Sequence, residues 1–295
     1  MDGRLVAVGL LLAGIGFACL TGAIMKGMVA TMPVLMAVWG RYVAYLLVML
    51  PIALYRHGRA VFNPPRRGVQ MLRAALLAVA TVTFAMVLHY LPFAEAVAIF
   101  YIYPFVMTAL SPLVLGERAG KVVWLGIAGG FAGVLIVMRP GIGTDPFPLL
   151  LTVFSGSLTA VFLLVTRLLS RVGDAVTMST YTALVTIGWL TLLVPFVWQT
   201  PNLNELAIFA LLGAATSASH WLTALAYGRA EATFLAPFTY LEIAVATLYG
   251  LLFFGDWPDL VAWTGFTVIV LSGVFVARAP AIAALLNRSR RADTE

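Results

Sequence analysis

Ten apolar segments, each long enough to cross a lipid bilayer, fill almost the whole chain and limit the folds open to it. They lie near residues 5–25, 33–55, 70–90, 95–115, 121–138, 147–168, 177–198, 205–226, 232–254 and 260–277. Because a bilayer core offers no water to backbone polar groups, such segments cross it as helices. Hydrophobic residues make up 62% of the 295 residues and charged residues 10%, whereas soluble domains carry about 25% charged residues. The sequence therefore predicts an all-α integral membrane protein with ten transmembrane helices.

Positive charges alternate between the short connections. Fifteen of the 18 Lys and Arg residues lie at the N-terminus or beside the ends of the even-numbered segments, Arg73 among them. Lys26 and Arg139 lie on the opposite side, and Arg41 lies inside the second segment. The positive-inside rule places the fifteen in the cytoplasm. This predicts a multi-pass protein of the bacterial inner membrane with both termini cytoplasmic. The basic patch after the second segment is mainly a determinant of this topology, and binding to anionic lipid head groups is a secondary interpretation. The charge distribution also argues against nucleic-acid binding.

The two halves of the chain resemble each other over residues 93–140 and 229–280. The matching positions are Ala94-Glu95-Ala96 with Ala230-Glu231-Ala232, Gly116-Glu117 with Gly255-Asp256, Trp124 with Trp263, Gly133-Val134 with Gly273-Val274, and Pro140 with Pro280. Each half has five segments, an odd number, so the second half crosses the membrane in the opposite sense. We expect one repeat over 1–140, an inverted repeat over 141–280 and a basic cytoplasmic tail over 281–295. Inverted repeats are typical of secondary transporters, which bind substrate near the midplane between the repeats.

Several short motifs carry a family resemblance over nearly the whole chain. They are Arg41, Pro104, Leu115-Gly116-Glu117-Arg118, Met138-Arg139-Pro140, Ala236-Pro237-Phe238-x-Tyr240 and Phe254-Gly255-Asp256-x-Pro258-Asp259. With these motifs the chain resembles ten-span EamA-type members of the drug/metabolite transporter superfamily. The resemblance implies an EamA-like fold and transport of a metabolite. Relatives carry amino acids, amines, nucleosides, S-adenosylmethionine or flavins.

Glu242 lies close to the middle of the apolar segment 232–254. An ionisable group at that depth costs roughly 2.5–3.5 kcal/mol on insertion scales, so a partner or a water-filled cavity is expected beside it. Three interpretations follow. Glu242 carries a coupling proton, it binds a cationic group of the substrate, or it forms a structural ion pair with Arg41, which lies at a similar depth. Arg41 could instead bind a carboxylate of the substrate.

Helical spacing gathers other polar and aromatic residues on shared faces, which predicts a polar cavity inside the bundle. The candidate substrate-binding or coupling residues are Glu242, Tyr240, Tyr101, His220, Thr108, Thr216, Ser155, Thr159, Trp221 and Arg41. The aromatic members suit a planar or cationic substrate. Pro104 and Pro237 lie inside apolar segments, where proline kinks a helix. They are candidate hinges for alternating access, with static kinks as the alternative.

The main functional hypothesis is a secondary active transporter for a small polar metabolite such as an amino acid or amine, with proton coupling as an option. The alternative is uptake of a larger aromatic or cationic metabolite, such as S-adenosylmethionine, a nucleoside or a flavin-like molecule. A lipid scramblase, a channel and a membrane-embedded enzyme are less favoured alternatives. The three histidines are dispersed, and the chain lacks metal-ligand and phosphate-binding motifs. No catalytic residue, metal or cofactor is therefore expected. Overlapping GxxxG patterns in segment 121–138 favour packing within one chain, and we expect a monomer or weak dimer.

Overall fold

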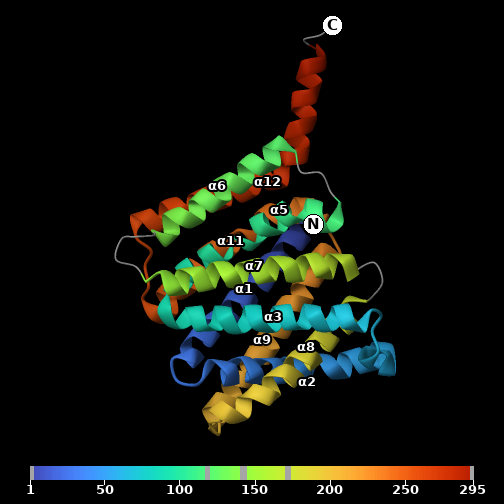
Figure 1. Ribbon diagram of the computed structural model, residues 1–295, viewed down its shortest axis with the longest axis vertical. Coiled ribbons are helices and arrows are strands. Elements are labelled where there is room, and N and C mark those ends of the chain that lie inside the picture. Colours follow the sequence, from blue (N-terminus) through green and yellow to red (C-terminus); the bar gives the residue numbers. More distant parts are fainter. Residues whose placement is uncertain (1–2, 117–119, 140–144, 170–173, 293–295) are drawn as a thin grey trace.

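The described part of the chain is helical throughout (Figure 1). The computed structural model describes residues 3–116, 120–139, 145–169 and 174–292. In the first half the helices are α1 (Gly3–Val29), α2 (Val34–His57), η1 (Gly58–Phe62), α3 (Arg67–Tyr90), α4 (Phe93–Phe100), α5 (Tyr103–Leu115) and α6 (Lys121–Met138). In the second half they are α7 (Pro146–Leu169), α8 (Ala175–Leu193), η2 (Val194–Val197), α9 (Leu203–Tyr227), α10 (Ala232–Thr239), α11 (Leu241–Phe254) and α12 (Leu260–Ala292). The prediction of an all-α membrane protein is confirmed.

Length and hydropathy suit these helices to a bilayer. Among the described residues, nine helical segments are long and apolar enough to span it, and Val123–Met138 is a shorter apolar helix. Large apolar side chains also cover the outside of the bundle; Leu47, Leu113 and Leu252 are 71%, 83% and 65% exposed. A soluble protein rarely exposes so much continuous apolar surface, whereas lipid tails solvate it. The outer surface is therefore the face toward lipid.

The predicted segments 95–115 and 232–254 are each divided into two helices by a break inside the span. The first breaks at Tyr101 and Ile102, between α4 and α5, and the second breaks at Tyr240, between α10 and α11. Pro104 has no N–H to donate to the carbonyl of Phe100, which interrupts the helical hydrogen bonds at the first break. Pro237 lies inside α10, one turn before the second break.

The broken helices match in detail between the two halves. Both α4 and α10 have eight residues. Both α5 and α11 end at a glycine in the left-handed region, Gly116 with φ of 70° and Gly255 with φ of 69°. A side chain strains this conformation, so glycine is the usual residue at a helix end of this kind. The structure thus repeats the element order that the sequence similarity suggests.

The long helices of one half pack mainly against long helices of the other half. Helix α1 packs against α9, and α3 packs against α7, while α2 packs against α8 and α9. Helices α6 and α12 lie together along one side of the bundle (Figure 1). Gly126, Gly129 and Gly133 of α6 face α12, where an added Cβ at Gly129 would lie 2.6 Å from Ser272 Oγ. The glycine pattern is used for close packing within the chain, as expected.

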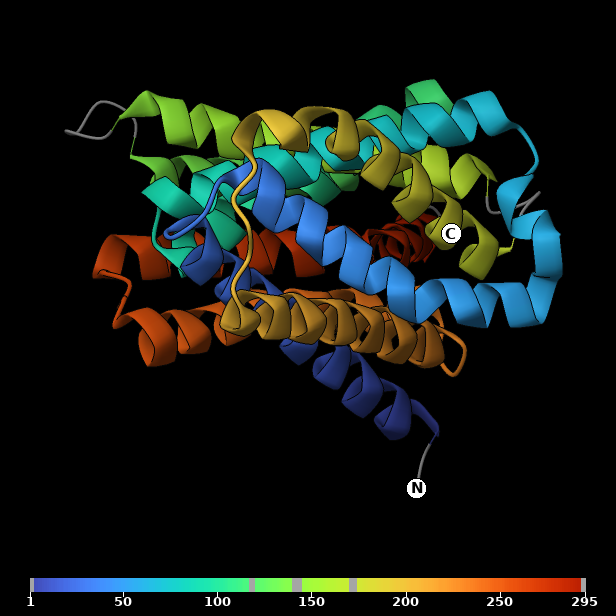
Figure 2. The ribbon, with the colours of Figure 1, turned by 90° about the horizontal axis from the view of Figure 1, so that it is seen from below.

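The connecting segments gather at the two ends of the bundle (Figure 2). At the C-terminus, α12 continues as a helix to Ala292, where a tail was expected from residue 281. This last part of α12 projects beyond the other helices (Figure 1). Glu117, Arg118, Arg171 and the expected repeat boundary at 140 and 141 lie outside the described residues.

Candidate functional site

A cavity of about 230 Å³ lies between α1, α2, α3, α7, α8 and α9. It is lined by Ala18, Thr21, Arg41, Tyr42, Tyr45, Arg73, Leu77, Thr81, Phe162, Ser179, Thr182, Ala183, Thr216, Ser219 and His220. Both halves of the chain contribute residues to this lining. Arg41, Thr216 and His220 are the sequence-predicted residues that the fold brings together here.

The cavity wall combines positive charge with aromatic rings. The guanidinium carbon of Arg41 lies 4.9 Å from the ring centroid of Tyr42, a cation–π distance. His220 Nδ1 lies 3.2 Å from the Tyr45 hydroxyl, and the two rings meet edge to face with centroids 5.4 Å apart. The Tyr42 hydroxyl lies 3.1 Å from Thr81 Oγ1. Since the described residues that line the cavity include no Asp or Glu, the cavity suits a ligand rich in hydrogen-bond acceptors or one that carries negative charge.

Arg73 is a cavity residue that the sequence interpretation assigned to the cytoplasmic basic patch. Its side chain is 3% exposed, and it is held in place from three sides. Its Nε donates to Thr166 Oγ1 at 2.8 Å, and its Nη1 donates to Gln70 Oε1 at 3.0 Å and to the carbonyl of Met178 at 3.3 Å. The guanidinium also lies 5.0 Å from the Phe162 ring centroid. One feature of the sequence pointed to this position of Arg73: the residue lies within the predicted apolar segment 70–90.

Thr216 presents an unpaired polar atom to the same cavity. Its Oγ1 is buried, and no described residue forms a hydrogen bond with it. A buried hydroxyl without a partner costs free energy of the order of 1–3 kcal/mol, so native structures rarely keep one without a reason. A ligand that hydrogen-bonds to this hydroxyl would remove the cost.

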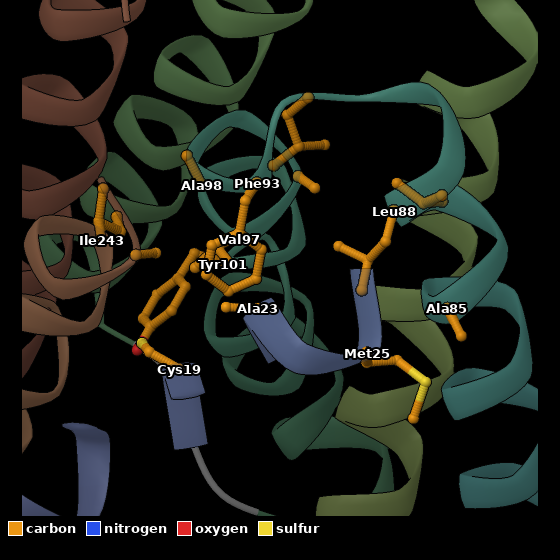
Figure 3. Close-up of a cluster of buried hydrophobic side chains, with 14 of the residues drawn as sticks. Cys19, Ala23, Met25, Ala85, Leu88, Phe93, Val97, Ala98, Tyr101 and Ile243 are labelled. Atoms are coloured by element: carbon orange, nitrogen blue, oxygen red, sulfur yellow. The ribbon is translucent and has the colours of Figure 1, made fainter. Parts of the chain in front are cut away.

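A second cluster lies where the two broken helices meet. The Tyr101 hydroxyl is 2.6 Å from the carbonyl oxygen of Thr239 and 2.7 Å from Glu242 Oε2. Tyr101 and Tyr240 stand at corresponding breaks of the two halves, and their ring centroids are 5.4 Å apart. Tyr101 is 1% exposed. Figure 3 shows it among buried hydrophobic side chains, with its hydroxyl end directed toward Cys19 of α1.

The structural ion pair between Arg41 and Glu242 is not formed. Within the described residues, the ion pairs are those of Lys26 with Asp256, His57 with Asp174 and Arg139 with Asp259. Arg41 lies against Tyr42 at the cavity, whereas Glu242 contacts Tyr101 at the helix break. Similar depth along two helices does not make their side chains neighbours, because rotation about each helix axis decides what each side chain faces. Proton binding and substrate binding remain as roles for Glu242.

The other sequence-predicted residues lie outside the cavity lining. Ser155 Oγ donates to the carbonyl of Ala80 at 2.7 Å and so ties α7 to α3. Thr108 and Thr159 donate to carbonyl groups one turn earlier on their own helices, at 2.7 and 3.0 Å. Trp221 is 44% exposed and lies 5.6 Å below the guanidinium of Arg56. Pro104 is the second residue of α5 and Pro237 lies within α10, beside the two breaks.

Ion pairs tie the two halves together at one end of the bundle. Lys26 Nζ lies 3.5 Å from Asp256 Oδ2 and donates to the carbonyl of Leu91 at 2.7 Å. Arg139 pairs with Asp259, which also accepts from the N–H of Ala262 at 2.9 Å. The Arg139 guanidinium and this N–H hold the pKa of the Asp259 carboxyl below its usual range.

Comparisons with known proteins agree on the class of protein. The model of the EamA-like transporter family matches residues 5–139. A riboflavin transporter of Rhizobium johnstonii is 30% identical over 276 residues, which cover 92% of this chain and 90% of the relative. An S-adenosylmethionine uptake transporter of Rickettsia bellii is 25% identical over 230 residues, covering 78% of this chain and 79% of the relative.

A solved crystal structure supports the fold independently. It superposes with a TM-score of 0.66 at 17% sequence identity, and the match covers 96% of this chain and 98% of the other. Together with the riboflavin transporter, which the chain matches over most of its length, these findings identify a multi-pass membrane protein of a transporter class. The chain belongs to the EamA-like transporter family.

Proposed function

We propose that the protein is a secondary transporter that takes up a planar heteroaromatic metabolite of the flavin type. The substrate binds in the cavity that Arg41, Arg73, Tyr45, Thr216 and His220 line. The observation that carries the proposal is the combination of two arginines, aromatic rings and an unpaired hydroxyl in one cavity without an acid.

The chemistry of the cavity separates the candidate substrates. A flavin ring presents carbonyl oxygens and ring nitrogens that accept hydrogen bonds from guanidinium and hydroxyl groups, and its flat face stacks on aromatic side chains. An amine or a sulfonium cation would meet two arginines and no carboxylate in this lining. This lining therefore favours the flavin-like alternative over the amino acid or amine of the main hypothesis. The relative from Rhizobium johnstonii, called a riboflavin transporter, supports the same choice.

The membrane setting is part of the proposal. The charge distribution supports a bacterial inner-membrane location with both termini in the cytoplasm. Alternating access of two inverted repeats about the cavity is the mechanism proposed, with Pro104 and Pro237 as hinges beside the helix breaks. The chain acts as a monomer or weak dimer, and lipid surrounds its apolar outer surface.

The test uses the purified protein in proteoliposomes with riboflavin as the probe. We expect time-dependent riboflavin uptake above that of empty vesicles, and a rise in melting temperature when riboflavin is added to detergent-solubilised protein. S-adenosylmethionine and amino acids serve as competitors, and neither should reduce uptake at equal concentration. Preferential uptake of S-adenosylmethionine or of an amine would overturn the choice of substrate.

A matched pair of arginine variants tests the binding site. Arg41→Met removes a cavity charge that rests on a tyrosine ring, and it should weaken riboflavin binding by roughly tenfold or more, since a hydrogen bond to a charged group is worth about 1.5–3 kcal/mol. Arg56→Met removes an arginine that rests on Trp221 away from the cavity, and binding should not change. Equal effects of the two variants would place the substrate elsewhere.

A further inference from the structure

The Tyr101 hydroxyl has one hydrogen but two acceptors at hydrogen-bonding distance. The carbonyl oxygen of Thr239 is 2.6 Å away, and Glu242 Oε2 is 2.7 Å away. A carbonyl oxygen and an ionised carboxylate both accept and neither donates. Two contacts this short cannot share one hydrogen with good geometry, because each short bond needs the hydrogen near its own axis. Both are satisfied when Tyr101 donates to Thr239 and a protonated Glu242 donates to the Tyr101 oxygen.

No described residue near Glu242 offers a charge that would stabilise a carboxylate. Helix α1 presents Cys19, whose Sγ lies 3.6 Å from the backbone carbonyl of Glu242. The break between α4 and α5 presents Tyr101 and Tyr103, with ring centroids 5.4 Å apart, and the break before α11 presents Tyr240. In the described part of the chain these are the titratable groups around the carboxyl, and none of the ion pairs formed there includes it. An ionised carboxylate in such a place would be buried without a counter-charge, which is strongly unfavourable.

We infer that Glu242 and Tyr101 form a proton-binding site, separate from the substrate cavity, at the crossing of the two broken helices. Neither residue lines the cavity. In the conformation described, Glu242 holds one proton and donates it in a hydrogen bond to Tyr101, which donates its own proton to Thr239. When the contact opens, the carboxyl releases that proton to water and becomes a carboxylate.

The repeat explains how the contact would open during a transport cycle, and this step rests on the proposed transport function. Aligning α4 with α10 sets Tyr101 against Tyr240 and Tyr103 against Glu242, so the acid occurs in one half alone. In the present conformation Tyr240 packs against Gly273 of α12. Gly133 of α6 is the matching glycine in the first half. If the halves exchange conformations, Tyr101 moves toward Gly133 and away from Glu242. The proton is then bound in one state and released in the other.

Infrared spectroscopy tests the proton directly and needs no substrate. The difference spectrum between the unmodified protein and Glu242→Gln at neutral pH should contain the carbonyl stretch of a protonated carboxylic acid. Tyr101→Phe should keep this band and shift it, because the acid loses its hydrogen-bond acceptor. The same shift assigns the band if Glu242→Gln does not fold. Glu231→Gln, which alters an exposed acid at the start of α10, should leave the band unchanged. A difference spectrum without a protonated carboxyl would overturn the inference.

Vesicle transport then tests the link to the cycle. Unmodified protein should show several-fold faster riboflavin accumulation when a pH gradient is imposed. Glu242→Gln should still exchange labelled riboflavin at equal pH but should lose the response to the gradient. An unchanged response in Glu242→Gln would overturn the coupling. If the unmodified protein carries no riboflavin, the proposed function fails, whereas the infrared result still decides whether Glu242 binds a proton.

Discussion

The two arginines of the cavity are held very differently. Arg73 donates to Thr166, Gln70 and the carbonyl of Met178, so its guanidinium has one position. Arg41 rests on the ring of Tyr42, and stacking alone restrains it less than a set of directional bonds. Arg73 therefore shapes the cavity, whereas Arg41 is free to follow a substrate.

This difference predicts opposite behaviour of two arginine variants. Arg73→Met leaves buried acceptors without their donor, at a cost of about 1–3 kcal/mol for each stranded group, and should lower the melting temperature with or without riboflavin. Arg41→Met should melt like the unmodified protein without riboflavin and should lose the riboflavin-induced rise. Thermal unfolding in detergent, with and without ligand, measures both. A normal melting temperature for Arg73→Met would contradict the structural role given to its hydrogen bonds.

Helix α9 approaches α2 so closely at Gly213 that only glycine fits. An added Cβ there would lie 2.5 Å from the carbonyl carbon of Ala44 and 2.8 Å from its oxygen. Both atoms belong to the backbone, which cannot rotate away as a side chain can. The two helices carry Arg41, Tyr45, Thr216 and His220 to the cavity, so their spacing sets the distance between these groups.

Gly213→Ala should therefore push α9 away from α2, at a cost of about 1–3 kcal/mol for an overpacked contact. Riboflavin binding should weaken together with stability. Gly9→Ala is the matched control, because an added Cβ at Gly9 meets nothing within 4 Å. It should leave the melting temperature unchanged or raise it slightly, since alanine favours a helix over glycine. Equal melting temperatures for the two variants would show that α9 can shift without cost.

The molecule as a whole is less symmetric than its repeats. Helix α4 packs against α11, whereas the matching helices α5 and α10 do not pack comparably in the described structure. The bundle end where α4 begins and α11 stops also carries the pairs of Lys26 with Asp256 and Arg139 with Asp259. These contacts join the two halves of the chain at that end. In the alternating-access mechanism proposed above, a difference of this kind between the two halves would distinguish one access state from the other.

Lowering the pH should destabilise this end of the bundle within a defined pH range. Because the folded-state pKa of Asp259 is lowered by Arg139 and the Ala262 N–H, the stabilisation is fully present above the usual Asp pKa of about 3.9. It is lost as the pH falls through the lowered folded value. Trp257 and Trp263 flank Asp259, with ring centroids 5.8 Å apart. Tryptophan fluorescence should therefore change below the usual Asp range, and Asp259→Asn should abolish that change. A transition of equal size in Asp259→Asn would assign it to another acid.

The sequence by itself determined the class of molecule, because a bilayer leaves an apolar chain few choices. Long apolar segments must form helices to satisfy their backbone, and the five segments in each half predict that the second half crosses the membrane in the opposite sense. The same reasoning predicted that Glu242 needs a partner or a water-filled cavity and that ten polar and aromatic residues contact the substrate or a coupling ion. Of these ten, Arg41, Thr216 and His220 lie in the cavity lining.

Only the tertiary structure decided which side chains meet. Segments 95–115 and 232–254 are each divided into two helices, at Tyr101 and Tyr240. Arg73 is buried inside the bundle, and the partner of Glu242 is Tyr101, where Arg41 was one of the predicted partners. Sequence position gives the depth of a residue along its helix and its face relative to neighbours on that helix. The neighbouring helix and the angle of approach depend on packing between segments far apart in the chain, such as α9 against α2 at Gly213.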